Sequence, residues 1–550
     1  MRLTKSLSIA GRILRSSRSV NGAGSQSRLT AALSLALAGA SIATATTAFA
    51  QTSTPSLEMP RPQLRPVTGM IMLDYSAITL SNGGAFDLFG IHYMQRANDW
   101  LYYGVGAFAP VARGDYGGFF GADATVHAQR YIGDSNWFVN AGLSVGAAAG
   151  GNSVTGIRRL SGEGFYGRAY AGIGYTHRNL SFGVNVSRVA VLDSLIDDTT
   201  VNFFVQRPFS FSVGSYADAG RRLSAAEFDS PRNDNIISVQ INNFAQINPQ
   251  GSFTGDIGVA SAQFSHFHSQ NVYSFFAVDI GISGLHWYNQ AHGGFGIRRA
   301  LSPRVNLYGQ IGLGSSGWVT DTVDTGSGFI IYPKATLEYL INNQFGATLS
   351  AGYQIAPRGT SRNWSVGLGL NYHLSHRRPS DTASASGLEY SLRGVRLNVF
   401  GRATSSITYN GRQSDGIGMI AVQADYMLND RWYLAGQVAA ATSSFRGYAG
   451  YAEGFVGVGW QSQRYASGRL QGYAQLMYGL NDVGVDFAHE VGTLLYPAVG
   501  LSYQVNDRLS LYSQLGATVS LGQYMGTHTN TFENYSLGLG VSYRFSLPTR

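Results

Sequence analysis

The sequence predicts an all-β protein, a closed antiparallel barrel that spans a membrane. Apolar and polar residues alternate through about two dozen short segments, which is the pattern of strands with one face in lipid. After an N-terminal export signal, no run of about 18 apolar residues could cross a membrane as a helix. Because only helices and closed barrels satisfy all their backbone hydrogen bonds in lipid, the alternation predicts a transmembrane barrel.

Residues 1–50 have the pattern of a secretory signal peptide. They contain six basic residues and no acidic one, followed by the apolar stretch Leu29–Ile42 and by Ala48-Phe49-Ala50. This order of a basic region, an apolar region and an A-x-A site predicts cleavage before Gln51. Residues 51–66 are then expected to form a periplasmic N-terminal segment.

Removal of the signal changes the charge of the chain. The full sequence has 39 basic and 31 acidic residues, and without the six basic residues of the signal 33 remain against 31. A net charge of +2 gives no reason to expect nucleic-acid binding. The absence of cysteine excludes disulfides, thiolate metal sites and cysteine nucleophiles. Lys334 is the only lysine after the signal.

The clearest strand signal is at the C-terminal end, over Tyr535–Phe545. One face carries apolar residues that begin and end with aromatic rings, whereas the other face carries mostly Gly and Ser. Such rings are typical of the two lipid–water interfaces. Trp364–Leu374 has the same design, and a half-buried strand of a soluble sandwich is the weaker explanation because an export signal precedes it.

The last strand resembles the C-terminal recognition signal of Gram-negative outer-membrane β-barrel proteins, the porin-like class. Gly540, Tyr543 and Phe545 carry this resemblance, although Ser546–Arg550 follow the Phe and members of the class usually end there. The resemblance covers nearly all of the mature chain and names no specific family. It implies location in the cell outer membrane, insertion by the barrel-assembly machinery, and contact with outer-membrane lipid and lipopolysaccharide.

The chain also repeats itself at intervals of about 160–170 residues. Ile330-Ile331-Tyr332-Pro333 matches Leu494-Leu495-Tyr496-Pro497, and a fainter copy runs through Tyr166–Val189. Three β-barrel repeats are therefore expected, at 67–215, 234–374 and 390–546, with about eight strands each and about 24 in total. We prefer one large up-and-down barrel, since several barrels in one chain are rare. The polar connections Tyr216–Asn233 and Ser375–Gly387 leave tandem smaller barrels as the alternative.

The expected strands fall in three sets of eight. They are 68–80, 84–94, 99–109, 116–130, 136–149, 163–176, 179–191 and 199–213; then 235–246, 254–266, 271–283, 288–299, 304–315, 327–340, 344–356 and 363–374; then 391–404, 415–428, 431–442, 451–464, 468–481, 491–504, 508–520 and 533–545. Short Asn- and Asp-containing turns alternate with longer loops such as Ser316–Gly326. This alternation places the short turns in the periplasm and the long loops outside.

Candidate catalytic residues are few and match no known lipase or deacylase motif. A His beside a Ser in a polar turn is usually just solvated, and two His six residues apart have no metal spacing. We therefore expect no enzyme activity and no catalytic, cofactor-binding or metal-binding residues, and no cofactor. The groups considered are His266, His268 and Ser269; Asp486, His489 and Glu490; His286 and His292; and the His-Arg-Arg run at 376–378.

The function expected from the sequence is a porin-like channel or an exopolysaccharide export port, because a 24-stranded barrel would be too wide for side chains to fill. Polysaccharide or small solutes would be its partners, since tyrosines stack on sugars and arginines attract anions. One alternative is a structural or surface-anchoring barrel without conductance. The other is a lipid A or phospholipid-modifying enzyme. A filled lumen would favour the structural class, and an outward-facing Ser–His pair would favour the enzyme.

Overall fold

The computed structural model describes most of the chain after residue 63. The described residues are 62, 64–151, 160–224, 235–285, 288–318, 322–374, 389–409, 411–443, 450–465, 468–482, 491–523 and 532–549. The predicted signal peptide, 1–50, therefore lies outside the described residues. No helix among those described is long and apolar enough to cross a membrane.

The first barrel closes on itself through strands β1–β8, each antiparallel to its neighbours, with β1 paired to β8. Because side chains alternate along each strand, every second residue points into the closed ring. Its strands are β1 Arg65–Thr79, β2 Ala85–Arg96, β3 Leu101–Ala109, β4 Phe120–Tyr131, β5 Trp137–Ala149, β6 Phe165–His177, β7 Leu180–Val191 and β8 Asp197–Val213.

The second barrel repeats this arrangement with strands β10–β17, and β10 pairs with β17 to close it. A register shift in β13 near the turn into β14 is one of its few irregularities. Its strands are β10 Asn235–Gln246, β11 Ile257–Phe267, β12 Val272–Ser283, β13 Asn289–Ser302, β14 Val305–Gly317, β15 Phe329–Leu340, β16 Phe345–Ile355 and β17 Arg362–His373.

The third barrel closes when its last strand, β27, pairs with its first, β18. Three short strands are added at its rims: β9 (Arg222–Ser224), β19 (Ile407–Tyr409) and β20 (Arg412–Ser414). The long strands are β18 Glu389–Thr404, β21 Gly418–Met427, β22 Trp432–Ala441, β23 Ala452–Tyr465, β24 Leu470–Asp482, β25 Val491–Gln504, β26 Leu509–Gln523 and β27 Phe532–Thr549.

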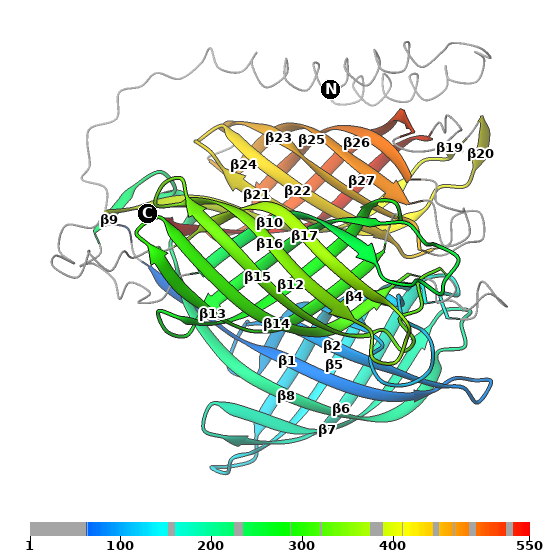
Figure 1. Ribbon diagram of the computed structural model, residues 1–550. Coiled ribbons are helices and arrows are strands. Elements are labelled where there is room, and N and C mark those ends of the chain that lie inside the picture. Colours follow the sequence, from blue (N-terminus) through cyan, green and yellow to red (C-terminus); the bar gives the residue numbers. More distant parts are fainter. Residues whose placement is uncertain are drawn as a thin grey trace, which may run out of the picture.

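The expected 24 long strands in three eight-strand repeats are thus confirmed, and each strand begins and ends within four residues of its predicted position. The preference for one large barrel is wrong. Instead, the first and last strands of each repeat pair with each other, so the chain forms the alternative, tandem smaller barrels (Figure 1). Nothing in the local alternation distinguishes these closures, because a strand has the same two faces whichever strand it pairs with.

The two faces of the wall are as the alternation predicts. Leu537 and Leu539 are 52% and 60% exposed on the outside, whereas Ser536 and Ser542 are buried inside. In the second barrel Leu368 is 67% exposed. An apolar outer surface of this extent on a closed barrel is suited to lipid.

Four of the short turns, with at least one in each barrel, share one construction. Asn98, Asn342, Asn429 and Asn506 each accept hydrogen bonds through Oδ1 from the backbone N–H groups two and three residues ahead, at 2.8 to 3.0 Å. The side chain thus stands in for a backbone acceptor and fixes a tight hairpin. All four turns lie at the same end of their barrels, which we call the short-turn end, and the opposite end is the long-loop end.

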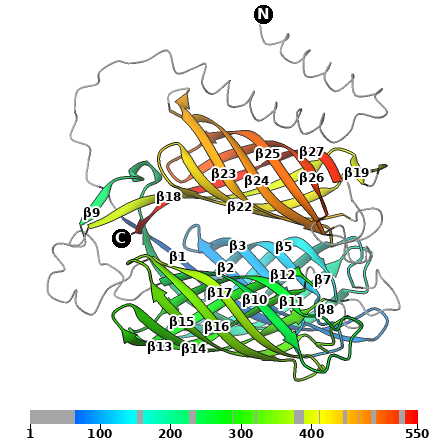
Figure 2. The ribbon, with the colours of Figure 1, turned by 45° about the horizontal axis from the view of Figure 1, so that its top comes forward.

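The three barrels lie side by side and each contacts the other two (Figures 1 and 2). At the long-loop end, Gly117 N–H of barrel 1 donates to Gly326 O of barrel 2 at 2.8 Å. At the short-turn end, Ser546 in the tail of β27 exchanges backbone hydrogen bonds with Gly214 of barrel 1 at 2.9 and 3.0 Å. Barrels 2 and 3 meet where the Tyr372 and Tyr426 hydroxyls lie 3.1 Å apart.

Candidate functional site

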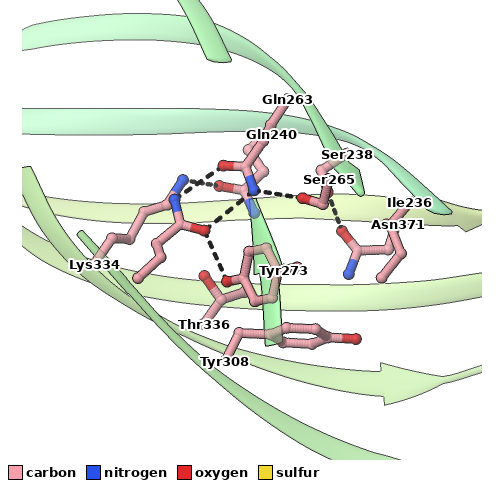
Figure 3. Close-up of a pocket in the computed structure, with 11 residues that line it drawn as sticks. Ile236, Ser238, Gln240, Gln263, Ser265, Tyr273, Tyr308, Lys334, Thr336 and Asn371 are labelled. Atoms are coloured by element: carbon pink, nitrogen blue, oxygen red, sulfur yellow. Dashed lines mark hydrogen bonds between the residues drawn. The ribbon is translucent and has the colours of Figure 1, made fainter. Parts of the chain in front are cut away.

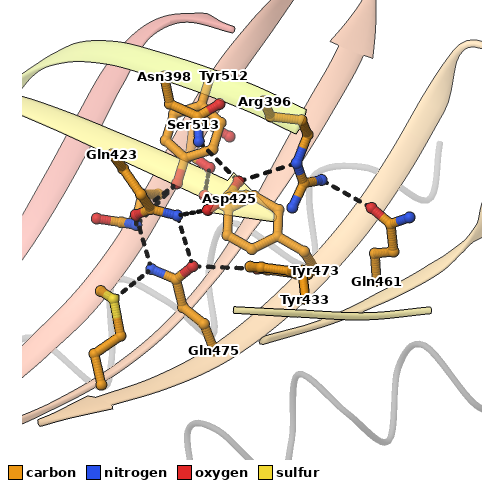
Figure 4. A network of polar contacts seen from close by, with 12 residues as sticks. Arg396, Asn398, Gln423, Asp425, Tyr433, Gln461, Tyr473, Gln475, Tyr512 and Ser513 are labelled. Atoms are coloured by element: carbon orange, nitrogen blue, oxygen red, sulfur yellow. Dashed lines mark hydrogen bonds and ion pairs between the residues drawn. The ribbon is translucent and has the colours of Figure 1, made fainter. Parts of the chain in front are cut away.

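The barrel interiors hold buried networks of polar side chains, and one such network lies in the lumen of barrel 3. Asp425 lies at the centre of its network (Figure 4). Its carboxylate accepts from Arg396 Nε at 3.0 Å, from Asn398 Nδ2 at 2.9 Å and from Gln423 Nε2 at 2.7 Å. The Arg396 guanidinium also lies over the Tyr433 ring, 4.4 Å from its centroid. These contacts join three neighbouring strands of the wall, β18, β21 and β22, from the inside of the barrel.

A second ion pair lies further along the same lumen. Arg402 of β18 pairs with Glu453 of β23, and both side chains are fully buried. The Tyr451 hydroxyl also donates to the Glu453 carboxylate. Two cations in this barrel are therefore each matched by a carboxylate on another strand, as buried charges require.

Barrel 1 contains a comparable charged group. Arg168 of β6 pairs with Asp74 of β1, and both are nearly fully buried. His92 lies between two carboxylates, 3.6 Å from Asp74 and 3.5 Å from Asp123. The cation at the middle of this lumen is thus also neutralised by a carboxylate across the barrel.

In barrel 2 the main carboxylate lies near the short-turn end. Glu338 accepts from Asn306 at 2.8 Å, from Tyr308 at 2.6 Å and from Asn371 at 2.7 Å, and His373 Nε2 lies 2.8 Å away. These side chains occupy the lumen near the short-turn end, and they give both carboxylate oxygens of Glu338 hydrogen-bond partners.

On the long-loop side of the Glu338 group is a small cavity of about 20 Å³, enough for roughly one water molecule (Figure 3). Lys334 is the one charged residue among those that line it. The lining residues are Ile236, Ser238, Gln240, Gln263, Ser265, Tyr273, Tyr308, Gln310, Lys334, Thr336 and Asn371. Gln263 and Gln310 donate to each other's side-chain oxygen at 3.1 and 3.0 Å, which braces one side of the cavity.

The arginines on the long strands differ in exposure. Arg168 and Arg544 are buried in lumens. Arg96 is an exposed side chain paired with Asp99, and the Arg188 side chain is 58% exposed beside Asp197.

The histidines and serine singled out at 266–269 lie at the short-turn end of barrel 2. Ser269 Oγ accepts from the backbone N–H of Val272 and so stabilises the turn, while His268 Nε2 lies 2.9 Å from Ser274 Oγ instead. His266 is within 2.7 Å of Asn235 Oδ1. Burial, and then the positive charge of Arg207, lowers the pKa of the His268 imidazole. A His–Ser pair therefore exists, but not between the residues that the sequence suggested.

The other residues considered from the sequence contribute less. His292 is buried in the lumen of barrel 2, near Asp279 at 3.8 Å. Within the described part of the chain, no group of three or more His, Asp or Glu side chains could hold a metal ion. His286, Asp486, His489, Glu490 and the run at 376–378 lie outside the described residues.

No protein-family model and no curated protein matches the sequence. Among solved structures, the chain is similar to Neisserial surface protein A, with 16% identity and a TM-score of 0.21, over 28% of this chain and 96% of that one. It is similar to the outer membrane protein OprG from Pseudomonas aeruginosa, with 14% identity and a TM-score of 0.19, over 28% and 97%. The copper transporter OprC gives 9% identity and a TM-score of 0.28, over 89% and 82%.

Proposed function

We propose that this protein, a β-barrel of the cell outer membrane, is a structural and surface-anchoring barrel that does not conduct solutes. The observation that carries the proposal is the filled lumen. Eight strands enclose a space just wide enough for side chains, and here buried ion pairs and hydrogen-bonded amides occupy it.

The Arg402–Glu453 pair supports this proposal because it joins β18 to β23, which are three strands apart around the wall, whereas Arg396 and Asp425 lie on neighbouring strands. Passage of a hydrated solute through barrel 3 would have to separate Arg402 from Glu453. Breaking a buried pair leaves an uncompensated charge, which costs about 3–5 kcal/mol. A wide conduit, such as a polysaccharide port, needs a larger strand number in one wall.

Planar-bilayer recording of the purified full chain tests the proposal. We expect no conductance steps from the wild-type protein. A matched variant, Arg402→Ala with Glu453→Ala, removes the pair that spans the lumen and should give small openings, which serves as the positive control. Steady wild-type conductance would overturn the structural role.

A narrow porin-like channel through barrel 2 is the second candidate. It is favoured by the cavity at Lys334, because a polar cavity beside a cation provides one binding site for an anion that passes through the lumen. The same recordings with a salt gradient test it, since an anion-selective reversal potential that Lys334→Gln abolishes would support this channel.

The proposal assigns no catalytic role. The His268–Ser274 pair is the group to test, because a neutral imidazole beside a hydroxyl is the minimum arrangement for nucleophilic catalysis. Incubation with phospholipid and lipid A vesicles should release no fatty acid. Release that Ser274→Ala abolishes would contradict the proposal and support a lipid-modifying enzyme.

The expected partners also follow from position. Arg96 and Arg130 lie next to short turns, so we propose that they contact phosphates of inner-leaflet lipid, while lipopolysaccharide meets the long-loop end. Strand β27, which carries the resemblance to the C-terminal recognition signal, is proposed as the segment that the barrel-assembly machinery binds.

A further inference from the structure

We propose that the lumen of barrel 2 binds one small monovalent anion, of the size of chloride, against the ammonium group of Lys334. The proposal goes beyond the structural role, and an ion held inside a filled lumen is compatible with a barrel that does not conduct. It rests on a buried cation, on a neighbour that is neutral where barrel 1 has a carboxylate, and on a cavity beside the cation.

The first observation is that Lys334 is buried with little to neutralise it. The residue is 5% exposed, and its Nζ donates to Gln240 Oε1 at 3.4 Å, which is a long hydrogen bond. Its ammonium group also lies 5.8 Å from the Tyr332 ring centroid. A lysine ammonium has three protons to donate, and a buried charge is costly unless it is paired.

The second observation is the comparison with the other barrels. In the repeat, Lys334 follows Tyr332 by two residues, as Arg168 follows Tyr166 and Ala498 follows Tyr496. In barrel 1 the group on the first strand that faces the cation is Asp74, whereas in barrel 2 it is the neutral Gln240. Barrel 2 has therefore kept a cation at this place without the carboxylate that barrel 1 supplies from its first strand.

The third observation is the cavity. It has about 20 Å³ and lies against Lys334, with hydroxyl groups of Ser238 and Thr336 and amide groups of Gln263 and Gln310 around it. The Ser238 hydroxyl donates to Asn371, and Gln263 donates to Ser265 and Gln310, so the groups that can donate to an anion are the Lys334 ammonium, the Thr336 hydroxyl and the second amide proton of Gln310. The volume matches roughly one water molecule, so a halide fits and phosphate, sulfate or a sugar does not.

One carboxylate opposes this binding. Asp279 is buried in the same lumen and interacts electrostatically with Lys334, but the two form no ion pair within 4.0 Å. Asp279 instead accepts from Gln290 Nε2 at 2.8 Å. Because Asp279 is not in ion-pair contact with Lys334, the side of the ammonium group that faces the cavity is open to an anion. Water is the competing occupant of the cavity.

The single lysine allows a direct test. The full chain carrying Lys5→Arg, labelled with ¹⁵N-lysine and folded in detergent micelles, has Lys334 as its only lysine ammonium. We expect its NMR signal to shift saturably when chloride replaces gluconate at constant ionic strength, because gluconate is too large for the cavity. The absence of a shift would mean that water alone occupies the site, and a shift of the same size in both salts would mean a general salt effect. Either result would overturn the proposal.

A matched variant distinguishes chloride binding beside Lys334 from an effect of chloride elsewhere on the protein. Gln240→Glu places a carboxylate where barrel 1 has Asp74, so Lys334 gains an internal partner and the chloride response should be lost. A chloride response that persists unchanged in this variant would also overturn the proposal. The comparison of the two salts on the chain with native Gln240 stands even if the variant does not fold. It reads ion binding and not conductance, so it is independent of the bilayer test of the structural role.

Discussion

Barrels 2 and 3 have the same wall but different interiors. Both close through eight antiparallel strands, and both use the same Asn-capped short turns. In barrel 3, Arg396 and Arg402 each meet a carboxylate. In barrel 2, Lys334 meets an amide and a cavity.

This difference shows which part of a small barrel specifies its fold. The outward apolar face is maintained in both, as Leu368 in barrel 2 and Leu539 in barrel 3 show. The lumen needs only to be filled and to satisfy its polar groups, so its charges can change from one repeat to the next. The wall determines the fold, and the lumen is free to acquire a separate role.

The largest effect is expected in barrel 3. Arg402→Met leaves Glu453 buried without its cation, so the free energy of unfolding should fall by about 3–5 kcal/mol. Urea titration of the barrel in detergent, followed by tryptophan fluorescence, measures this change.

The control for this prediction removes both charges. Arg402→Met combined with Glu453→Gln should recover much of the lost stability, because no uncompensated charge remains. Equal instability of the single and double variants would show that the pair acts through packing and not through charge.

The next effect concerns the wall and should be alike in the two barrels. Leu539→Arg in barrel 3 and Leu368→Arg in barrel 2 each place a charge on the lipid face, which should cost about 2–4 kcal/mol near the midplane of the membrane. The same urea titration reads both. If Leu539→Arg were neutral while Ser542→Arg was not, the assignment of the two faces would be reversed.

A smaller effect is expected at Lys334. Lys334→Met removes a cation that has no carboxylate within ion-pair distance, so stability should change by no more than about 1 kcal/mol. Urea titration in a chloride-free buffer is the appropriate measurement. A loss as large as that of Arg402→Met would mean that the two lumens depend equally on their cations, and the contrast between them would disappear.

The last prediction concerns the common orientation of the barrels and not their stability. Single cysteines at Asn342 and Asn506, in the short turns, should resist a membrane-impermeant maleimide on intact cells, whereas a cysteine at Ser81 or Thr322 in a long-loop-end connection should react. The chain has no native cysteine, so the background is low. Labelling of the short turns alone would invert the orientation.

The positions of the strands and their lipid-facing side chains could be predicted from the sequence because both are local. Period-two alternation in Trp364–Leu374 or Tyr535–Phe545 identifies a strand and its faces without knowledge of its neighbours. The turns were also predictable, since Asn429 and Asn506 tolerate the backbone of tight hairpins and cap it with their own side chains.

Barrel closure could not be predicted in this way because it is a long-range property. Whether β8 pairs with β1 or with β10 changes no residue within either strand. The long connections between the repeats were the available signal, and they allowed both outcomes. The short strands β9, β19 and β20 were missed because three residues carry no periodicity.

The candidate site was only partly visible in the sequence. Lys334 stands out as the single lysine of the mature chain, and it is in phase with Tyr332 and Thr336 on the inward face of its strand. In an alignment of the repeats, Lys334 occupies the same position as Arg168, and this match was a usable signal for a cation in the lumen. Its neutral neighbour Gln240 is 94 residues away and became apparent only in the fold.

The tail of β27 has a consequence for how the first and third barrels are held together. Beyond Phe545 the chain continues as a strand that pairs with Arg393 and Leu392 and bonds to Gly214 at the end of barrel 1. The segment after Phe545 therefore fastens the first barrel to the third at the short-turn end. Removal of this segment would leave the three closed walls in place but would take away this joint between them. Because one polypeptide carries all three barrels, the joint always connects one first barrel to one third barrel, an arrangement that separate subunits reach only by matched expression.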